Sequence, residues 1–470
     1  MIVMKFGGTS VQDAAALRNA SQIVMKNLTR RPLVVLSACA GVTTELLSMA
    51  EEAASGSATG SRLRISELRR RHGMIALELF GVSGSHDCIE RFREDEEALK
   101  RIIDGIAVLG EIPPRILDQV ASYGELWSTF LFAKLLGEHG VPAKWLDIRQ
   151  VMTTDDNFSQ ASPLLDTVKE KAQEVVKPSA EGGLTVITQG YIGATRDGRT
   201  TTLGRGGSDY SAAILGAALG AEEIQIWTDV DGILTADPSI IEAARPIERM
   251  SFLEASELAY FGARVLHPST ILPAIKSNIP VRVLNSKKPA SVGTLIQNNG
   301  TNGQNGVVKS ITYKEGITVV TVQSTRMLLA HGFLARVFAI FERYKKSIDV
   351  VATSEVGISI TVDRNDHIEA IASELQEFAE VRVEQGKAVV CVVGEGMKRT
   401  KGIAGRVFCT LGDADVNVEL ISHGGSDINL TFVIDESQIE LAVEKLHSEF
   451  FQHSGSQHAR RPSAEKHPSP

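Results

Sequence analysis

A polar, glycine-rich turn between an apolar strand and a small-residue helix constrains this chain most. The run TTLGRGGSDYSAA, residues 201–213, follows the apolar segment LTVITQGYIG. Glycines let the backbone turn tightly, and the start of the following helix offers unpaired N–H groups and a partial positive charge. Arg205 can bind a carboxylate or phosphate through two parallel hydrogen bonds, and Asp209 can hold a cation. Because open α/β sheets bind ligands at the carboxyl ends of their strands, the pattern predicts an anion-binding site.

Two further strand-to-loop junctions repeat this pattern. The chain begins MIVMKFGGTSV, in which Lys5 ends an apolar run and Gly7 and Gly8 follow it. A second apolar strand, in RPLVVLSACAGVTTELL, ends at Ser37, and small residues lead to Thr43 ahead of a helical pattern. Neither G-x-x-x-x-G-K-[ST] nor G-x-G-x-x-G occurs around the first junction. One such junction is weak evidence, but three in one α/β chain indicate phosphate chemistry.

Composition excludes several classes of function. A chain of 470 residues is long enough for about two to four domains. Its net charge of −8 argues against nucleic acid or a membrane surface as a partner. No apolar run approaches the roughly 18 residues that span a bilayer, so we expect a cytoplasmic enzyme. The cysteines and histidines show no paired metal spacing, so we expect no metal site built from protein side chains.

The order of apolar patterns divides the chain into domains. Strand-like runs alternate with helical patterns up to about residue 295, which is typical of a parallel sheet covered on both faces. The polar, glycine-rich run QNNGTNGQNG follows and reads as a linker or exposed loop. The predicted divisions are an α/β domain at 1–296, a linker at 297–306, two smaller units at 307–384 and 385–452, the second with a strand borrowed from 307–316, and a disordered tail at 453–470.

The two smaller units form an internal repeat. The 32 residues from His331 align without gaps to those from Lys401. Each copy reads as helix, strand, turn and strand with an apolar strand before it, which predicts two βαββαβ units that pair through exposed edges. Six positions of the first copy are identical seventy residues later: Gly332, Arg336, Val337, Phe338, Ile358 and Thr361.

Six motifs in this order resemble the aspartate kinases: KFGGTS, LSACAGVT, SYGELWS, TTLGRGGSD, WTDVDGI and FGARVLHP. The similarity extends to about residue 450, and it is closest to the monofunctional, lysine-sensitive type. The resemblance implies an amino-acid kinase fold, an αβα sandwich around an open, mainly parallel sheet, followed by two ACT domains. It implies phosphorylation of the L-aspartate side chain by ATP, giving 4-phospho-L-aspartate in the first step of lysine, threonine and methionine biosynthesis.

This chemistry needs charge neutralisation and in-line alignment more than a base, because an aspartate side chain with a pKa of about 4 is already ionised. By resemblance, Lys5 stabilises the transferring phosphate and Asp209 holds Lys5. The substrate residues implied by the resemblance are Arg205 for the α-carboxylate, Glu125 for the α-amino group, and Ser37 and Thr43 as pocket walls.

The nucleotide site follows from the same resemblance. ATP is expected with Mg²⁺, which is bound through phosphates and water. Three positions depart from the family pattern, since Leu234 replaces a tyrosine, Ser239 an arginine and Arg264 a lysine. The expected ATP-binding residues are Lys5, Gly7, Gly8, Thr228, Asp229, Leu234, Asp237, Ser239 and Arg264.

The first repeat resembles the lysine-binding ACT copy of the family, with L-lysine as allosteric effector and a homodimer or tetramer formed through the ACT domains. Ala330 departs from the pattern by replacing a serine. The alternative is that the two acids in this set face solvent. The expected effector-binding residues are Met327, Gly332, Phe333, Leu334, Asp349, Thr353, Ser354 and Glu355.

Two other functions stay open at this point. One is a kinase of the same fold that acts on another substrate, such as glutamate, carbamate or UMP; SYGELWS and the paired C-terminal units argue against it. The other is a non-catalytic amino-acid sensor, which would have no need to keep Lys5, Arg205 and Asp209 together.

Overall fold

The computed structural model describes residues 1–262, 268–298, 307–324, 331–363, 366–423 and 427–452. Within these ranges the chain forms two compact units. The first comprises residues 1–234 and the part of the chain from 246 to 298, and the second comprises residues 235–245 and the part from 307 onward. Residues 235–245 lie inside the range predicted for the α/β domain, yet they pack with the C-terminal unit.

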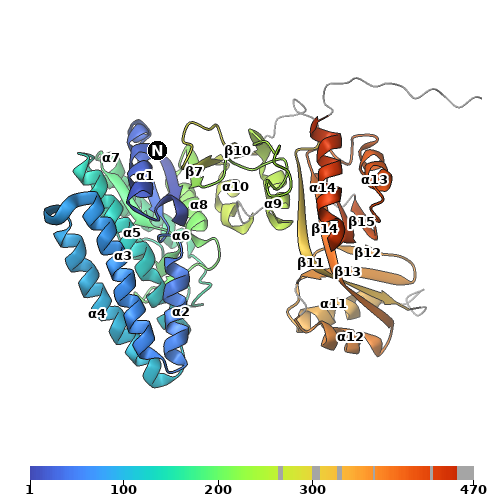
Figure 1. The fold of residues 1–470 in the computed structure, drawn as a ribbon, viewed down its shortest axis with the longest axis horizontal. Coiled ribbons are helices and arrows are strands. Elements are labelled where there is room, and N and C mark those ends of the chain that lie inside the picture. Colours follow the sequence, from blue (N-terminus) through green and yellow to red (C-terminus); the bar gives the residue numbers. More distant parts are fainter. Residues whose placement is uncertain (263–267, 299–306, 325–330, 364–365, 424–426, 453–470) are drawn as a thin grey trace, which may run out of the picture. The chain divides into compact units, whose positions relative to one another are not determined.

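An eight-stranded sheet forms the centre of the first unit, and its strands β7 and β10 are labelled in Figure 1. The strand order is β3-β4-β2-β1-β7-β9-β10-β8. Every neighbouring pair is parallel except β9 with β10. Strands β1, β2 and β4 are buried along their whole length, which explains their near-continuous apolar sequences. The strands are β1 (Ile2–Phe6), β2 (Pro32–Leu36), β3 (Ala143–Leu146), β4 (Thr185–Gln189), β7 (Glu223–Thr228), β8 (Arg249–Ser251), β9 (Val281–Asn285) and β10 (Thr294–Gln297).

Helices cover both faces of this sheet. Helices α1 to α5 share one apolar core with β1 and β2, and α8 packs with α6 and α10. A short antiparallel pair, β5 (Ile192–Ala194) and β6 (Thr200–Thr202), follows β4. The helices are α1 (Ala14–Lys26), α2 (Val42–Ala54), α3 (Ala58–Gly84), α4 (His86–Leu109), α5 (Pro114–Glu138), α6 (Leu165–Lys171), α7 (Lys177–Glu181), α8 (Gly207–Leu219), α9 (Phe252–Tyr260) and α10 (Leu272–Lys276).

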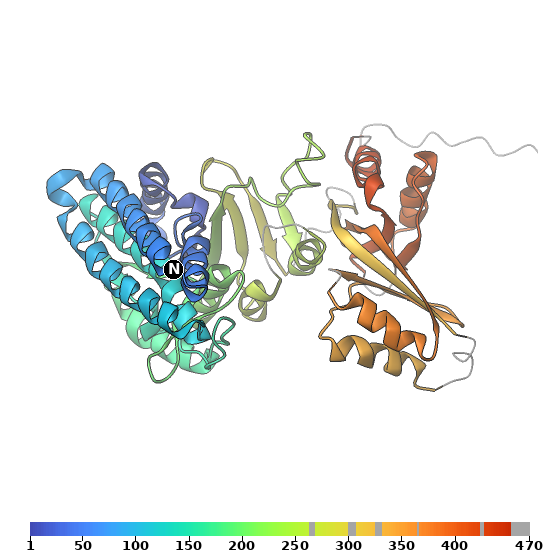
Figure 2. The same ribbon diagram turned by 60° about the horizontal axis from the view of Figure 1, so that its bottom comes forward.

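The second unit is one sheet shared by the two repeats, drawn from yellow to red in Figure 2. Its six strands have the order β12-β13-β11-β14-β16-β15. All its strand pairs are antiparallel. The strands are β11 (Ser310–Gln323), β12 (Val351–Thr353), β13 (Gly357–Asp363), β14 (Glu380–Val393), β15 (Leu420–His423) and β16 (Asn429–Asp435). The helices are α11 (Phe333–Arg343), α12 (Ile368–Gln376), α13 (Ile403–Asp413) and α14 (Ile439–His447).

The two central strands each serve both repeats. Residues Ile317–Gln323 of β11 pair with β13 of the first repeat. Residues Ser310–Lys314 of the same strand pair with residues 389–393 of β14, in the second repeat. Val308 and Ile311 belong to the apolar core of the second repeat, together with Ala236 and Ile241 from the 235–245 segment. The αβα sandwich followed by two βαββαβ units confirms the predicted fold class.

The backbone repeats as the sequence does. Gly332 and Gly402 precede α11 and α13 with φ values of 83° and 86°. Lys345 has a positive φ, and so does Asp415 seventy residues later, although few non-glycine residues adopt positive φ values. The two copies therefore share local geometry as well as sequence.

Packing around α5 gives a stability prediction. A Cβ at Gly124 would lie 2.7 Å from Ala38 Cβ and 3.2 Å from Val42 Cγ1. Gly124→Ala should therefore push α5 from the loop after β2 and lower the free energy of unfolding by about 1–3 kcal/mol. The measurement is urea unfolding followed by circular dichroism. Gly105→Ala in α4 is the control; nothing lies within 4 Å of its Cβ. That change should stabilise by up to about 1 kcal/mol. Equal effects of the two substitutions would contradict the packing argument.

Candidate active site

A cavity of about 720 Å³ lies where the loops after β1 and β2 meet α5 and the start of α8. The structure brings together side chains that are far apart in the sequence, because the carboxyl ends of parallel strands lie at the same edge of a sheet. Of the residues predicted from the sequence, the cavity is lined by Lys5, Gly8, Ser37, Thr43, Glu125, Arg205 and Asp209.

An ion pair lies in this cavity. Lys5 Nζ, from β1, is 2.7 Å from Asp209 Oδ1, in the first turn of α8, and the two side chains are 10% and 15% exposed. Gly206 has φ 72° and forms the N-cap of α8, so the helix begins directly beside the pair. A cation fixed next to a helix N-terminus is an environment that stabilises phosphoryl oxygens.

The loops after β1 and β2 are joined through their backbones. The Gly7 N–H donates to the carbonyl of Trp227 (3.0 Å), and the Ala40 N–H donates to the carbonyl of Gly8 (3.1 Å). A Cβ at Gly8 would lie 2.9 Å from the carbonyl oxygen of Ala38. Glycine is therefore required at position 8 so that the two loops approach this closely.

Glu125 is a buried carboxyl group that faces the cavity from α5. Its side-chain Oε1 accepts the Ala38 N–H at 3.2 Å, whereas Oε2 is buried and has no hydrogen-bond partner among the described residues. Burial raises the pKa of Glu125 to about 8. An unpaired buried carboxylate is costly, so the site favours a ligand that supplies a cationic donor there.

Arg205 lies on the loop before α8. Gly204 and Gly206 on either side have φ values of 74° and 72°, which presents the arginine on a tight turn. Its side chain is exposed, and no hydrogen bond or ion pair joins it to the described residues. The loop therefore offers a guanidinium fork that a planar anion can bind.

Sequence reasoning missed three residues here. Arg71 of α3 donates to the carbonyls of Gln12 (3.3 Å) and Ala40 (3.1 Å), where the sequence suggested a solvated face. Asp118 of α5 and Tyr191 line the cavity. No local motif marks Arg71 or Asp118, whereas the sequence QGYIG places Tyr191 directly after a buried strand.

Two further features concern the reactivity and strain of lining residues. Tyr191 has a φ of 67°, in the left-handed region that is uncommon for tyrosine, and its N–H donates to Ser211 Oγ at 3.1 Å.

Burial raises the pKa of the Cys39 thiol to about 12, and its S–H donates to the carbonyl of Val11 at 3.0 Å. Cys39 is thus a neutral buried thiol rather than a nucleophile.

The predicted nucleotide residues divide between the two units. Thr228 ends β7, where its carbonyl accepts the Ser286 N–H at 2.7 Å and its hydroxyl donates to Asp229 at 3.2 Å. Leu234 forms a β-bridge with Pro246 in the same unit. Asp237 and Ser239 belong to the C-terminal unit, where the Ser239 N–H and hydroxyl donate to Asp237 Oδ1 at 2.8 and 2.6 Å. Arg264 lies outside the described residues.

The predicted effector residues lie in the first repeat, at the start of α11 and around the β12–β13 turn. Gly332 caps α11, which begins with Phe333 and Leu334. Thr353 ends β12, the Ser354 N–H donates to the Gly357 carbonyl at 2.8 Å, and Glu355 is exposed. Met327 lies outside the described residues.

Asp349, in the same predicted set, is buried rather than solvated. Its side chain is 2% exposed and lies 2.9 Å from Lys314 Nζ, which is also 3.4 Å from Asp363. The second repeat contains the same arrangement, with Lys387 2.5 Å from Glu419 and 3.7 Å from Asp435. The internal repeat therefore extends to a lysine held between two acids.

Comparison with known protein families agrees with this fold. Residues 1–285 match the model of the amino acid kinase family, and residues 390–450 match an ACT domain model. The chain therefore belongs to the amino acid kinase family, a class of phosphotransferases.

Curated relatives narrow the class. The chain is 39% identical over 469 residues to lysine-sensitive aspartokinase 3 of Escherichia coli K12, covering 96% of this chain and 99% of the relative. It is 37% identical to the chloroplastic aspartokinase 3 of Arabidopsis thaliana over 96% of this chain and 81% of that protein. Within its family, the chain is an aspartokinase and a kinase enzyme.

Solved structures show the same relationship. E. coli aspartokinase III in complex with aspartate and ADP superimposes with a TM-score of 0.82 at 38% identity, covering 96% of this chain and all of that chain. The same enzyme in complex with lysine and aspartate gives a TM-score of 0.79 at 38% identity, covering 96% and 99% of the two chains. The described part of the present structure contains no helix long and apolar enough to cross a membrane.

The raised pKa of Glu125 predicts how stability depends on pH. Unfolded glutamate ionises near 4.5, whereas the folded site keeps the proton until about pH 8. Folding therefore takes up a proton between these values, and the contribution of Glu125 to stability falls as pH rises through this window. Glu125→Gln should remove that decline. The free energy of unfolding of the variant, compared with that of wild type, should therefore increase by on the order of a few kcal/mol between pH 4.5 and pH 8. Urea unfolding across this range measures the difference, and a difference that does not change with pH would contradict the assignment.

Proposed function

We propose that this aspartokinase transfers the γ-phosphoryl group of ATP to the side-chain carboxylate of L-aspartate and that L-lysine inhibits it by feedback. The products are 4-phospho-L-aspartate and ADP, in the first step toward lysine, threonine and methionine, in the cytoplasm. The observation that carries the proposal is the Lys5–Asp209 pair, 2.7 Å apart, in one cavity with the carboxyl of Glu125 and the guanidinium of Arg205.

Lys5 supplies the positive charge at the reacting phosphoryl group. Asp209 holds Nζ in place, so that the positive charge of Lys5 stabilises the negative charge of the transition state. The backbone at Gly7 and Gly8 and the start of α8 approach the phosphates closely. Because the attacking carboxylate is ionised at neutral pH, no group in the cavity needs to remove a proton.

The substrate is bound at both ends of its α-amino-acid group. Arg205 binds the α-carboxylate through two parallel hydrogen bonds, and Glu125 accepts hydrogen bonds from the α-ammonium group through its unpartnered Oε2. Ser37 and Thr43 line the remaining wall. This pairing of an acid with a guanidinium favours an amino acid over carbamate or UMP, and the retained Lys5 favours an enzyme over a sensor.

The nucleotide is bound by the loop after β7. Thr228, Asp229, Leu234, Asp237 and Ser239 are the proposed ATP contacts, with Arg264 completing the set. In the described residues, no three His, Cys, Asp or Glu side chains are grouped to hold a metal. Mg²⁺ is therefore proposed to enter with the ATP phosphates, where it neutralises their charge.

The regulatory unit contains part of this nucleotide loop. The Ile311 N–H donates to the Thr235 carbonyl at 2.9 Å, and the hydroxyl of Thr235 is 3.0 Å from His447 Nε2 of α14. Ala236 and Ile241 complete the core of the second repeat. Asp237 and Ser239 therefore belong to the same compact unit as the proposed effector site, and an effector that shifts the second repeat would move them with it. The same sheets provide the edges through which we propose that a homodimer or tetramer forms.

The proposed effector site is in the first repeat. Backbone groups at Gly332, Phe333 and Leu334 are suited to an α-carboxylate, and Asp349 and Glu355 are suited to cationic groups. Thr353, Ser354 and Met327 complete the proposed site. The crystal structure of the E. coli relative in complex with lysine and aspartate supports lysine as the effector.

Loss of the cavity's cation should abolish turnover. Lys5→Ala leaves Asp209 without its partner and the transferring phosphate without its neutralising charge, so kcat should fall at least a thousandfold. Acyl-phosphate formation from L-aspartate and ATP, trapped with hydroxylamine, measures this. Lys26→Ala in α1, a surface lysine, is the control and should keep wild-type kcat. A Lys5 variant that keeps a tenth of wild-type kcat would contradict the proposed role.

The repeat offers a matched test of the effector site. Asp349→Asn should raise the L-lysine concentration for half-inhibition at least tenfold and leave kcat without lysine within twofold, because it removes the buried charge that holds Lys314 at the proposed effector site. Glu419→Gln removes the equivalent acid from the second repeat and is expected to leave lysine inhibition unchanged. Steady-state rates at increasing L-lysine measure both. Unchanged inhibition in Asp349→Asn, or equal weakening in the two variants, would refute the assignment.

A further inference from the structure

Three consecutive threonines form β6, and each hydroxyl is bound by a different part of the first unit. The Thr200 hydroxyl accepts from Arg149 Nη1 at 3.0 Å, and Thr201 and Thr154 share a hydrogen bond of 2.8 Å. The Thr202 hydroxyl donates to Asp118 Oδ1 at 2.8 Å. This buried strand leads directly into the loop that carries Arg205, so its position determines where that loop begins.

Asp118 accepts three of the hydrogen bonds that hold β6 and its neighbouring segment in place. The side chain is buried in α5, and its Oδ2 accepts the N–H groups of Ser159 (2.8 Å) and Thr202 (3.0 Å). Both carboxylate oxygens are therefore occupied by donors from two other segments. Three hydrogen bonds to one buried carboxylate are strong, and their donors are fixed in position by it.

The two segments bound by Asp118 support the Arg205 turn from both sides. Thr202 precedes Arg205 by three residues. The carbonyl of Ser159 would lie 3.4 Å from a Cβ at Gly204, and the Ala161 N–H donates to the Thr202 carbonyl at 2.9 Å. Asp118 thus holds the start of the turn and the backbone that packs against it.

The same helix carries Glu125. Asp118 and Glu125 are seven residues apart on α5, which is about two turns, so their side chains project from the same face. A rigid helix therefore connects the acid that faces the cavity to the acid that binds the Arg205 loop.

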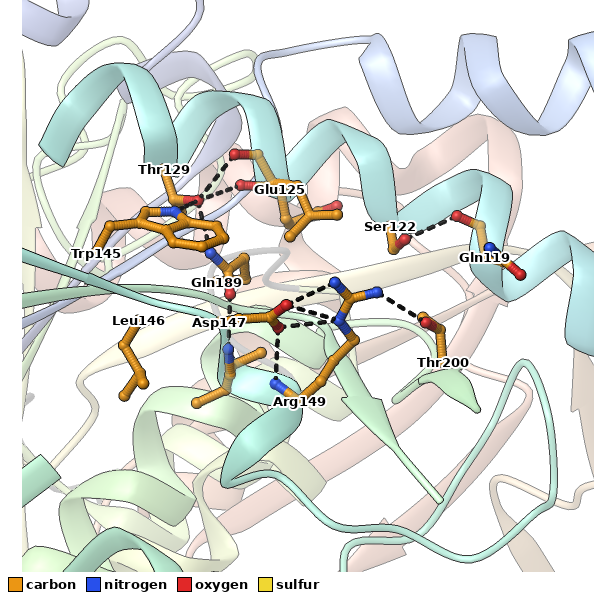
Figure 3. A network of polar contacts seen from close by, with 12 residues as sticks. Gln119, Ser122, Glu125, Thr129, Trp145, Leu146, Asp147, Arg149, Gln189 and Thr200 are labelled. Atoms are coloured by element: carbon orange, nitrogen blue, oxygen red, sulfur yellow. Dashed lines mark hydrogen bonds and ion pairs between the residues drawn. The ribbon is translucent and has the colours of Figure 1, made fainter. Parts of the chain in front are cut away.

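The other end of β6 is fixed independently (Figure 3). Arg149 is bound by Asp147 through Nε to Oδ1 at 2.9 Å and through Nη2 to Oδ2 at 2.6 Å, which leaves Nη1 for Thr200. Figure 3 also shows Thr129 of α5 donating to the Glu125 carbonyl and accepting from Trp145 and Gln189. The strand before the turn and the helix that carries Glu125 are thus both held by buried polar contacts.

We propose that Asp118 is a positioning residue that sets the spacing between Arg205 and Glu125 and so makes the enzyme selective for a substrate with a carboxylate and an ammonium group on one carbon. The inference rests on the proposed substrate roles of Arg205 and Glu125. Asp118 lines the cavity, but its two oxygens already accept three hydrogen bonds, so the proposed role runs through Thr202 and Ser159 rather than through direct contact with substrate. A shift of a few tenths of an ångström at Thr202 would weaken a ligand that binds both Arg205 and Glu125 more than a ligand that binds only one of them.

Substitutions at Thr202 test this with little change in volume. Thr202→Val removes the hydroxyl that Asp118 accepts, and Thr202→Ser keeps it. Thr201→Val is the matched control, since it removes an equally buried hydroxyl of the same strand that is bound by Thr154 instead. Thr202→Val should raise the KM for L-aspartate about tenfold and keep the KM for ATP within twofold, whereas Thr202→Ser and Thr201→Val should keep both near wild type.

Selectivity separates positioning from general destabilisation. Succinate lacks the α-ammonium group and β-alanine lacks the α-carboxylate, so each can use only one end of the site. Their inhibition constants against L-aspartate should change less than threefold in Thr202→Val, so that the advantage of L-aspartate over both falls. Asp118→Asn should have the same effect, and adding Thr202→Val to it should cause little further change because the two act through one contact. If Asp118→Asn does not fold, the Thr202 series still decides.

The outcomes are distinct. Equal effects of Thr202→Val and Thr201→Val, a parallel rise in the KM for ATP, or an unchanged KM for L-aspartate would overturn the inference. Arg205→Ala and Glu125→Gln, measured alongside, test the proposed roles themselves. If these two leave the KM for L-aspartate unchanged, the substrate assignment fails; if they raise it and Thr202→Val does not, only the positioning inference fails.

Discussion

The structure of the site depends on one buried ion pair between residues 204 positions apart. Lys5 is on β1, which has parallel neighbours on both sides, paired with Val35 of β2 and Ile226 of β7. Moving two charges out of water is costly, and their attraction offsets this cost only when the geometry is held. The rest of the sandwich supplies that geometry, because the sheet fixes Lys5 and the start of α8 fixes Asp209. A mobile lysine would not place its charge where the phosphoryl group must be neutralised.

Two other charged side chains of the cavity, Arg205 and Glu125, are also held where a ligand can neutralise them. Arg205 is without a partner among the described residues, and Glu125 is buried with one unpartnered oxygen and a pKa raised to about 8. With this raised pKa, Glu125 holds a proton near neutral pH when no cation lies beside it. A ligand ammonium beside it would favour the carboxylate, so the proposed substrate brings the charge that the site lacks. The proposed substrate role of Glu125 thus depends on an ammonium group, which a simple anion does not have.

The sequence predicted the residues at the strand ends because that prediction needs only topology. Once Lys5, Ser37 and Asp209 are placed after parallel strands or at a helix start, the fold brings them to one edge. Arg71 and Asp118 could not be predicted in this way. Each acts on backbone groups at least 31 residues away, and their neighbours in sequence are ordinary helix residues. The repeated threonine of β6 was visible, but its three partners lie on three other segments.

The unit to which a segment belongs could not be predicted from its sequence alone, for a similar reason. Apolar periodicity shows that a segment is buried but does not identify what it is buried against. The segment 235–245 follows a strand of the sandwich, yet Ala236 and Ile241 complete the core of the second repeat. Its sequence therefore reads as part of one unit and packs with the other. That packing is what gives the proposed nucleotide loop a direct connection to the regulatory unit.

The repeat also bears on how one of two similar copies can acquire effector specificity. Each copy holds a lysine between two acids, Lys314 with Asp349 and Asp363, and Lys387 with Glu419 and Asp435. A feature present in both copies serves the shared fold first, so Asp349 alone cannot distinguish them. The sequences differ just after β12 and β15, where Ser354 and Glu355 correspond to two glycines at the same repeat positions. Glu355 is exposed, whereas Asp427, the acid that follows β15 in the second copy, lies 3.3 Å from Arg399. The difference in charge at position 355, added to a common scaffold, is therefore the simplest physical basis for a cationic effector to prefer the first repeat.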